Sequence, residues 1–332
     1  MGRLILTTAG TSLIHPNAER WRGIIPEAFS GAVKACDDNH DCTLDKVITG
    51  GNNALKDAEV NILRELNSLT LDRDWQRFPA EIASTSKLDP RPDQGDRIVV
   101  LHSDTIEGAF CARCVAFLMS DRLKVLRLER NRVQEDGILS NANQLSQQRA
   151  DLRSKGILCQ PFWSARVELL RIDKLKPDER GAQDFREQGC QNLAIALSSL
   201  FIERDTTAHR RVHLNMTGGL KSSIPFVTFV AMLWGIPLVY LYEESPDLLS
   251  FTVPRLKLAV DIENCLKAAP DNWPAINKVT GAKDYFAEGP EGTPQLTLLG
   301  RVVQRTLLIR DESKDESKAP LEAQDKSRGT SS

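Results

Sequence analysis

The sequence has no long apolar run, no signal-peptide pattern and no strong excess of charge of either sign. None of its apolar stretches reaches the ~20 residues that span a bilayer, and the N-terminus lacks the regions of a secretory signal. The formal net charge is −2 at pH 7, which argues against electrostatic binding to long nucleic acid but allows a local basic pocket. We therefore expect a cytoplasmic protein without a membrane partner.

Cysteine is present, but not in a pattern typical of disulfides or zinc. The seven cysteines are odd in number and irregularly spaced, which favours reduced thiols. Cys111 and Cys114 form a C-x-x-C pair, yet no second pair or histidine pair stands at zinc spacing. On a helix the two side chains would lie one turn apart, so core packing is favoured over a redox or metal role. No metal or cofactor is expected.

The two common glycine-rich nucleotide motifs are also absent, but another glycine turn is present. Neither G-x-x-x-x-G-K-[ST] nor a G-x-G-x-x-G after a strand occurs, so ATP and NAD are poor candidate ligands. Instead, a strand is predicted over 212–216, an apolar helix over 222–234 and a buried strand over 236–242.

The turn between that first strand and the helix contains Gly218, Gly219 and Lys221. Two glycines let backbone N–H groups approach an anion, and the helix N-terminus adds partial positive charge. The Lys221 ammonium is placed to reach a phosphate. The same residues also fit a plain tight turn followed by a solvated lysine, so the pattern alone leaves both interpretations open.

Strands alternate with helices along most of the chain. This order, with continuous apolar strands, predicts an α/β fold: a Rossmann-like, mostly parallel sheet with helices on both faces. Ligands of such sheets bind beyond the carboxyl ends of the strands, near the switch point. Three loops meet that condition, at residues 9–12, 103–108 and 217–221. The strands that precede them or lie between them are predicted at 3–8, 96–102, 123–128 and 167–172.

The 332 residues are enough for one large or two modest domains. We expect residues 1–253 to form the α/β domain, with a polar insertion at 130–160 that stays outside the sheet. Residues 254–310 contain helical patterns around a Pro- and Gly-rich middle, which fits a small α+β, winged-helix-like region. The charged tail at 311–332 lacks aromatic residues and is expected to be disordered.

The glycine turn belongs to a longer motif, N-x-T-G-G-x-K, formed by Asn215, Thr217, Gly218, Gly219 and Lys221 ahead of the apolar helix. Other motifs accompany it in a fixed order. They are an early loop with Thr7, Thr8, Gly10, Thr11 and Ser12, the segment Ala80-Glu81-Ile82, the run Ser103-Asp104-Thr105-x-Glu107-Gly108, and an ending with Tyr240, Glu243 and Phe251-Thr252-Val253-Pro254.

In this order the motifs resemble those of CRISPR-associated Rossmann-fold (CARF) domains, over roughly residues 3–258. The branch that the chain is most similar to has a small winged-helix-like C-terminal region and no attached toxic nuclease. That branch includes ring nucleases, which degrade the cyclic oligoadenylate messengers of type III CRISPR defence. The resemblance implies a homodimer that binds cyclic tetra-adenylate and cleaves it to linear di-adenylate with a 2′,3′-cyclic phosphate end.

The resemblance also assigns roles to the three loops. The nucleophile is a ribose 2′-hydroxyl of the substrate, so the protein need only align it and stabilise charge, and no metal is required. Lys221 would stabilise the phosphorane, Thr11 or Ser12 would orient the hydroxyl or phosphate, and Asn215 would brace the turn. The implied ligand-binding set is Ala9, Gly10, Ser103, Asp104, Thr105, Asn215, Thr217, Gly218 and Gly219.

Several alternatives use the same pocket. A non-catalytic sensor or sink would bind the ring without cutting it, and a transcriptional regulator would add DNA binding by the C-terminal region, which is not strongly basic. A ring of six adenylates suits two-fold symmetry as well as one of four.

Arg204 and His209 match an R-x-x-x-x-H ribonuclease pattern, which we attribute to coincidence because it spans a helix end within the sheet domain.

Polar residues beside the loops also admit two interpretations. His102 ends a strand next to Ser103 and suits either a pocket or a structural role, whereas His213 alternates into its strand and is better explained as a wall or core residue. Asp104 and Glu107 have side chains that bind adenine or ribose edges, but capping of the following helix is favoured.

Overall fold

The computed structural model describes residues 2–10, 13, 53–129, 131–135, 139–175, 182–206, 211–219, 221–242, 246–268, 284–288 and 294–316. These residues divide into two compact units, one within Met1–Lys257 and one within Leu258–Ser332. No helix of the described part of the chain is long and apolar enough to cross a membrane.

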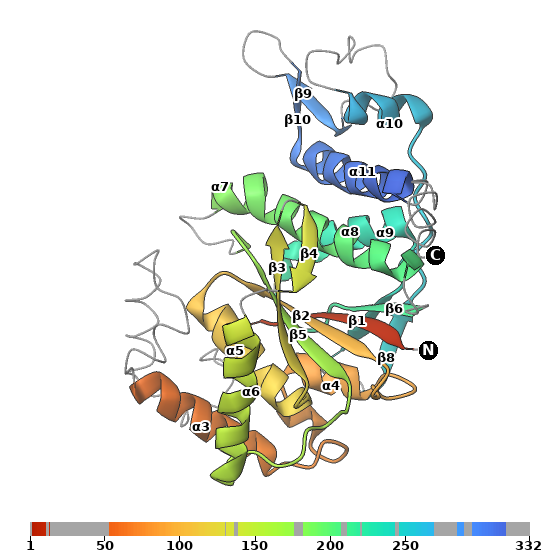
Figure 1. The fold of residues 1–332 in the computed structure, drawn as a ribbon. Helices are drawn as coiled ribbons and strands as arrows, with labels where there is room; N and C mark the ends of the chain where they lie inside the picture. Colours follow the sequence, from red (N-terminus) through yellow and green to blue (C-terminus); the bar gives the residue numbers. More distant parts are fainter. Residues whose placement is uncertain are drawn as a thin grey trace, which may run out of the picture. The chain divides into compact units, whose positions relative to one another are not determined.

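An eight-stranded sheet forms the centre of the larger unit (Figure 1). Its order is β4-β3-β5-β2-β1-β6-β7-β8, and all neighbours are parallel except the two edge strands β4 and β8, which are antiparallel. The predicted Rossmann-like, mostly parallel sheet is confirmed. The strands are β1 (Arg3–Thr8), β2 (Arg97–Ser103), β3 (Leu123–Glu129), β4 (Arg132–Glu135), β5 (Arg166–Ile172), β6 (Arg211–Asn215), β7 (Leu238–Leu241) and β8 (Leu248–Phe251).

Helices cover both faces of this sheet. Figure 1 shows α3, α5 and α6 on one side and α7, α8 and α9 on the other. The helices are α3 (Asn53–Asn67), α4 (Ala80–Ser86), α5 (Ile106–Met119), α6 (Leu139–Ser154), α7 (Ala182–Asp184), α8 (Cys190–Thr206) and α9 (Ile224–Trp234), with short helical turns η3 (Trp75–Arg77), η4 (Phe185–Gly189) and η5 (Lys221–Ser223). Because α5 is almost entirely apolar, it is buried along nearly its whole length.

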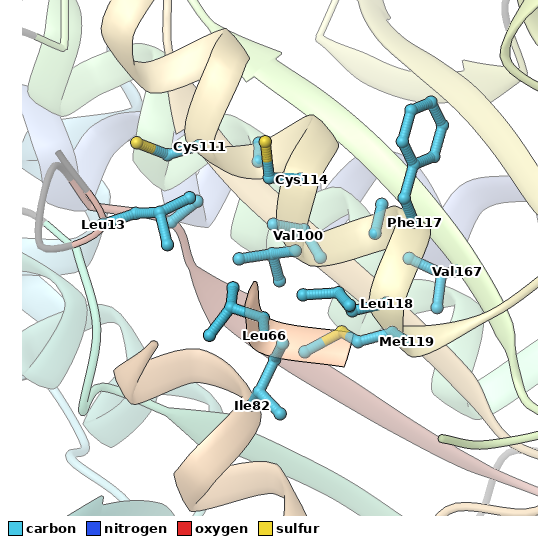
Figure 2. Packing of buried hydrophobic residues seen from close by; sticks show 14 of the residues in the cluster. Leu13, Leu66, Ile82, Val100, Cys111, Cys114, Phe117, Leu118, Met119 and Val167 are labelled. Atoms are coloured by element: carbon cyan, nitrogen blue, oxygen red, sulfur yellow. The ribbon is translucent and has the colours of Figure 1, made fainter. Parts of the chain in front are cut away.

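The hydrophobic core lies between the sheet and helices α3, α4 and α5. Cys111 and Cys114 belong to it, together with Leu66, Val100 and Phe117 (Figure 2). Both thiols are buried and free, and burial raises the pKa of each well above the ordinary value for cysteine. The expected core position of the C-x-x-C pair is confirmed.

The prediction that the polar segment 130–160 stays outside the sheet was wrong for β4, whereas most of the segment forms helix α6, which lies on the sheet and not in it. Strand β4 pairs with β3 and forms one edge of the sheet. Helix α6 packs on the core through Leu145 and Leu152, and Arg149 donates from Nε to the Phe117 carbonyl at 2.9 Å. An edge strand and a surface helix each bury only one side, so few apolar residues suffice for either.

The last strand of the sheet is β8, which pairs antiparallel with β7, and no strand follows it over residues 252–258. Three large apolar side chains at this edge are exposed, namely those of Tyr242, Leu249 and Phe251.

The smaller unit contains α10 (Val260–Lys267), an antiparallel pair β9 (Phe286–Glu288) and β10 (Pro294–Leu296), and α11 (Leu298–Glu316). This agrees with a small α+β region. Helix α11 continues through residues 311–316, which we expected to lie in a disordered tail. The Lys267 ammonium pairs with both Glu263 and Asp311, so charged residues hold this part of the helix against α10.

Candidate functional site

The carboxyl ends of β1 and β6 meet at the switch point of the sheet. Strand β1 pairs in parallel with β2 on one side and with β6 on the other. The chain builds β2, β3 and β5 on the first side before it crosses to β6 and β7 on the second. The loops after β1 and β6 therefore leave the sheet side by side, where ligands of such folds bind.

The two loops are packed backbone to backbone. The Thr8 hydroxyl donates to the Gly218 carbonyl. A Cβ on Gly10 would lie 2.7 Å from the Gly219 Cα, closer than real Cβ contacts allow. Gly219 also has φ of +88°, in the left-handed region, and a Cβ there would lie 2.4 Å from Thr8 Oγ1. Both glycines are required. Gly10 is needed because the two backbones approach closely, and Gly219 is needed for that reason and for its positive φ.

Asn215 and Thr217 fix the glycine turn to its surroundings. Asn215 is fully buried and donates from Nδ2 to Ser84 Oγ of α4 at 2.6 Å. Its Oδ1 accepts from the Thr217 N–H at 3.2 Å and from the Thr217 hydroxyl at 2.8 Å. The Thr217 oxygen in turn accepts from the Leu241 N–H at 2.8 Å. Asn215 thus has the contacts of a brace, and so does Thr217, whose single hydroxyl proton is directed at Asn215.

Glu81 lies between the same two loops and was not among the predicted site residues. Its side chain is 1% exposed, and Oε1 accepts from the Gly10 N–H at 2.8 Å. A Cβ on Gly218 would lie 2.3 Å from that oxygen. Burial raises the pKa of Glu81 to about 7, against the opposing effect of the Gly10 hydrogen bond. The available sequence signal was the segment Ala80-Glu81-Ile82, one of the motifs that accompany the glycine turn, in which Glu81 is the single carboxylate. In the structure, α4 is buried from Glu81 to Ser86.

The loop after β2 is held by its own hydrogen bonds. Ser103 Oγ and Thr105 Oγ1 lie 2.9 Å apart, and Thr105 Oγ1 accepts from the Gly108 N–H at 3.0 Å, so Thr105 caps α5. Asp104 instead accepts from the Lys174 N–H at 3.0 Å and joins this loop to the turn after β5. The prediction that Asp104 caps the helix was therefore wrong, because Thr105 occupies that position.

The remaining predicted site residues differ in exposure. Ala9 is buried and donates its N–H to the Leu101 carbonyl at 2.7 Å, whereas Lys221 begins η5 and is exposed. Thr11 and Ser12, the predicted partners of Lys221, lie outside the described residues. Within the described part of the chain, no group of three or more His, Cys, Asp or Glu side chains could hold a metal ion.

Neither described histidine has the surroundings of a catalyst. The buried His102 contacts the Ser103 carbonyl through Nδ1 at 2.8 Å, and burial lowers its pKa to about 4. His213 lies beside Ile5 in the middle of β6, half-buried, with a pKa lowered by burial and then by Arg3. Both therefore fit structural positions. His209 lies outside the described residues.

Comparison with protein families finds a match to part of the chain. Residues 155–255 are similar to the family Cas_APE2256, described as a CRISPR-associated protein. The matched segment runs from before β5 to beyond β8 and contains the glycine turn with Asn215 and Lys221. Comparison with curated proteins finds no match. Over this part of the sheet the chain is similar to a CRISPR-associated family, and the match supports a CRISPR-associated protein.

Proposed function

We propose that this protein is a homodimeric, CARF-type ring nuclease that binds cyclic tetra-adenylate and cleaves it without a metal. The observation that carries the proposal is the Gly218-Gly219 turn, packed against Gly10 at the switch point and located within the segment that matches a CRISPR-associated family. Its occupant is inferred from the resemblance to CARF domains and from the chemistry described below.

The turn suits a phosphodiester. Gly219 has no side chain to cover its backbone N–H. Because η5 and α9 follow the turn, the positive end of a helix dipole points at it. Lys221 adds an exposed ammonium at the first residue of η5. Asn215 and Thr217 hold this arrangement before a ligand arrives, which reduces the entropy lost on binding.

The reaction needs no protein nucleophile. A ribose 2′-oxygen attacks the adjacent phosphorus, the bond from phosphorus to the 5′-oxygen breaks, and the 5′-oxygen leaves with a proton. The product ends are a 2′,3′-cyclic phosphate and a 5′-hydroxyl. Two cuts in a ring of four nucleotides give two linear di-adenylates. Lys221 stabilises the negative charge of the phosphorane, and Thr11 or Ser12 orients the attacking hydroxyl.

Two-fold symmetry explains why a dimer is proposed. A ring of four identical nucleotides has a two-fold axis, so a second copy of this chain would present the same turn and the same lysine to the opposite phosphate. Each protomer then supplies one cleavage site. A sedimentation measurement of the ring-bound protein should give twice the chain mass.

The decisive experiment is incubation of labelled cyclic tetra-adenylate with the protein in EDTA, beside Lys221→Ala. Loss of one transition-state contact typically lowers the rate by ~10²–10³, so the variant should release di-adenylate at least a hundredfold more slowly. The matched control is Lys124→Ala, which removes a partly exposed lysine of β3 that is paired with Glu135 of the edge strand β4, and this variant should cleave normally.

The products decide between the alternatives. Linear di-adenylate with a cyclic phosphate end supports the nuclease. A ring that the wild-type protein binds but never cuts would establish a sensor or sink instead. Cyclic hexa-adenylate, tested in parallel, settles the ring size, and failure to bind either ring would overturn the assignment of the pocket.

A further inference from the structure

Glu81 is a buried carboxyl group with no ion-pair partner among the described residues. The other fully buried carboxylates of the described sheet domain are paired with arginine: Asp96 with Arg3, Glu168 with Arg97 and Arg166, and Glu59 with Arg113. A charged carboxylate without such a partner is costly to bury. Glu81 therefore differs from the other buried carboxylates in lacking an arginine partner among the described residues, and packing alone does not explain this difference.

Its position connects the two loops of the candidate site. One oxygen accepts the Gly10 N–H, and the same carboxyl group fills the space that a side chain on Gly218 would need. The two glycines come from β1 and β6, and Glu81 comes from α4. A change in charge at this carboxyl group thus acts on both loops together, directly behind the turn that faces the proposed phosphates.

Among the described residues, the elements packed around Glu81 bring no cation that affects its pKa. From α5 come Cys111 and Glu107. The pKa of the Cys111 thiol is raised mainly by burial, and then by the charges of Glu81 and Glu107. From η3 comes Arg77, which is paired with Glu65 at 3.6 Å. The loops after β1 and β6 contribute uncharged residues in their described parts, and β7 contributes a phenol and apolar side chains.

We propose that Glu81 is a positioning residue that must be protonated for the two glycine loops to accept an anionic ligand, so that the site takes up a proton when it binds. This inference rests on the proposed function, because the ligand is taken to be the phosphodiester ring. A neutral carboxyl group still accepts the Gly10 hydrogen bond, but it does not repel phosphates in front of the turn. An ionised one does.

The sign and the size of the effect follow from this arrangement. The free protein has Glu81 with a pKa of about 7, and nearby phosphates raise the pKa further, because a like charge favours the neutral form. Affinity is then full below that pKa and is lost as the pH rises through it. A single required proton makes the ring bind about tenfold more weakly at about pH 8 than at about pH 6. His102, with a pKa of about 4, stays neutral throughout.

The test uses the cyclic tetra-adenylate ring with 2′-deoxyriboses, which lacks the nucleophile and stays intact. Its dissociation constant is measured at both pH values for the wild type, Glu81→Gln and Glu135→Gln. The glutamine at 81 keeps an oxygen acceptor and has no charge, so its affinity should equal that of the wild type at the lower pH and should not change with pH. Glu135 is exposed and paired with Lys124, so its variant should behave as the wild type does.

Calorimetry of the wild type gives a second readout that needs no variant. Titration near pH 7 in two buffers of different ionisation enthalpy should report uptake of about half a proton per site. A wild-type affinity that is independent of pH, or a Glu81→Gln variant with the wild-type pH profile, would overturn the role of Glu81 and leave the ring-binding proposal intact. No ring binding at either pH would instead contradict the proposed function itself.

Discussion

The amino ends and the carboxyl ends of the parallel strands, here called the amino edge and the carboxyl edge, differ in how their buried carboxylates are stabilised. At the amino edge, Asp96 accepts from the Arg3 backbone N–H at 2.7 Å and from its guanidinium, and Glu168 is paired with Arg97. At the carboxyl edge, Glu81 accepts from the Gly10 backbone N–H, and the other buried contacts join neutral groups such as Asn215.

The contrast is visible in the direction of the two pKa shifts. Burial by itself raises the pKa of Asp96, but the hydrogen bonds and charge of Arg3 outweigh it and hold the pKa below its ordinary value. Burial raises the pKa of Glu81 to about 7, and no cation among the described residues compensates it. We infer that ion pairs make the amino edge rigid, whereas the carboxyl edge keeps its local charge adjustable for a ligand.

The largest expected effect comes from breaking the amino edge. Asp96→Ala leaves the buried Arg3 guanidinium without its carboxylate, so the free energy of unfolding should fall by about 3–5 kcal/mol. Asp72→Ala is the matched control, because Asp72 and Arg91 form an exposed pair whose removal should cost less than about 1 kcal/mol. Urea unfolding measures both, and equal losses in the two variants would contradict the contrast.

The next effect is a gain in stability at the carboxyl edge. The pKa of Glu81 rises from 4.5 to about 7 on folding, so the folded state is stabilised relative to the unfolded one below the lower value and loses that contribution as the pH rises toward the upper one. The loss amounts to about 3 kcal/mol. Glu81→Gln avoids it, so the variant should become more stable than the wild type between about pH 4.5 and about pH 7. A stability difference that is the same at both pH values would show that Glu81 does not titrate there.

A smaller effect on stability, with a large one on binding, is expected from the glycine turn. Gly219→Ala forces a Cβ at positive φ onto Thr8, whereas Gly156→Ala places one at φ of +68° in open space after α6. The first should cost about 2 kcal/mol more than the second. Ring binding should be lost in Gly219→Ala and retained in Gly156→Ala. Thermal unfolding and ring titration measure the two readouts.

The sequence predicts the inner strands well because parallel strands are buried on both faces. Strand β1 was expected over 3–8 and occupies Arg3–Thr8, and β5 was expected over 167–172 and occupies Arg166–Ile172. Strand β4 was missed because an edge strand needs little apolar content, and here only Val133 is buried. The continuous apolar run that reveals inner strands is absent from such a segment.

The site could be located from the sequence but not assembled from it. The glycine motif indicates the loop after β6, and the switch-point rule indicates the loop after β1. The sequence does not show that Glu81 closes the space behind both loops, because Gly10 and Glu81 are separated by 71 positions. It also does not show that the Thr217 hydroxyl is engaged by Asn215 and Leu241, since hydrogen-bond direction depends on the folded turn.

The contact between Thr8 and Gly218 also bears on how the molecule forms. It joins residues 210 positions apart, and the bond from Asn215 to Ser84 spans 131. Contacts of such long range form slowly, and a chain is synthesised from its N-terminus. Strand β1 therefore keeps an unpaired side, with an associated risk of aggregation, until β6 has been made and docked. Competence to bind a ligand would therefore arise only when β6 docks on β1, so that a sheet without β6 is an inactive one.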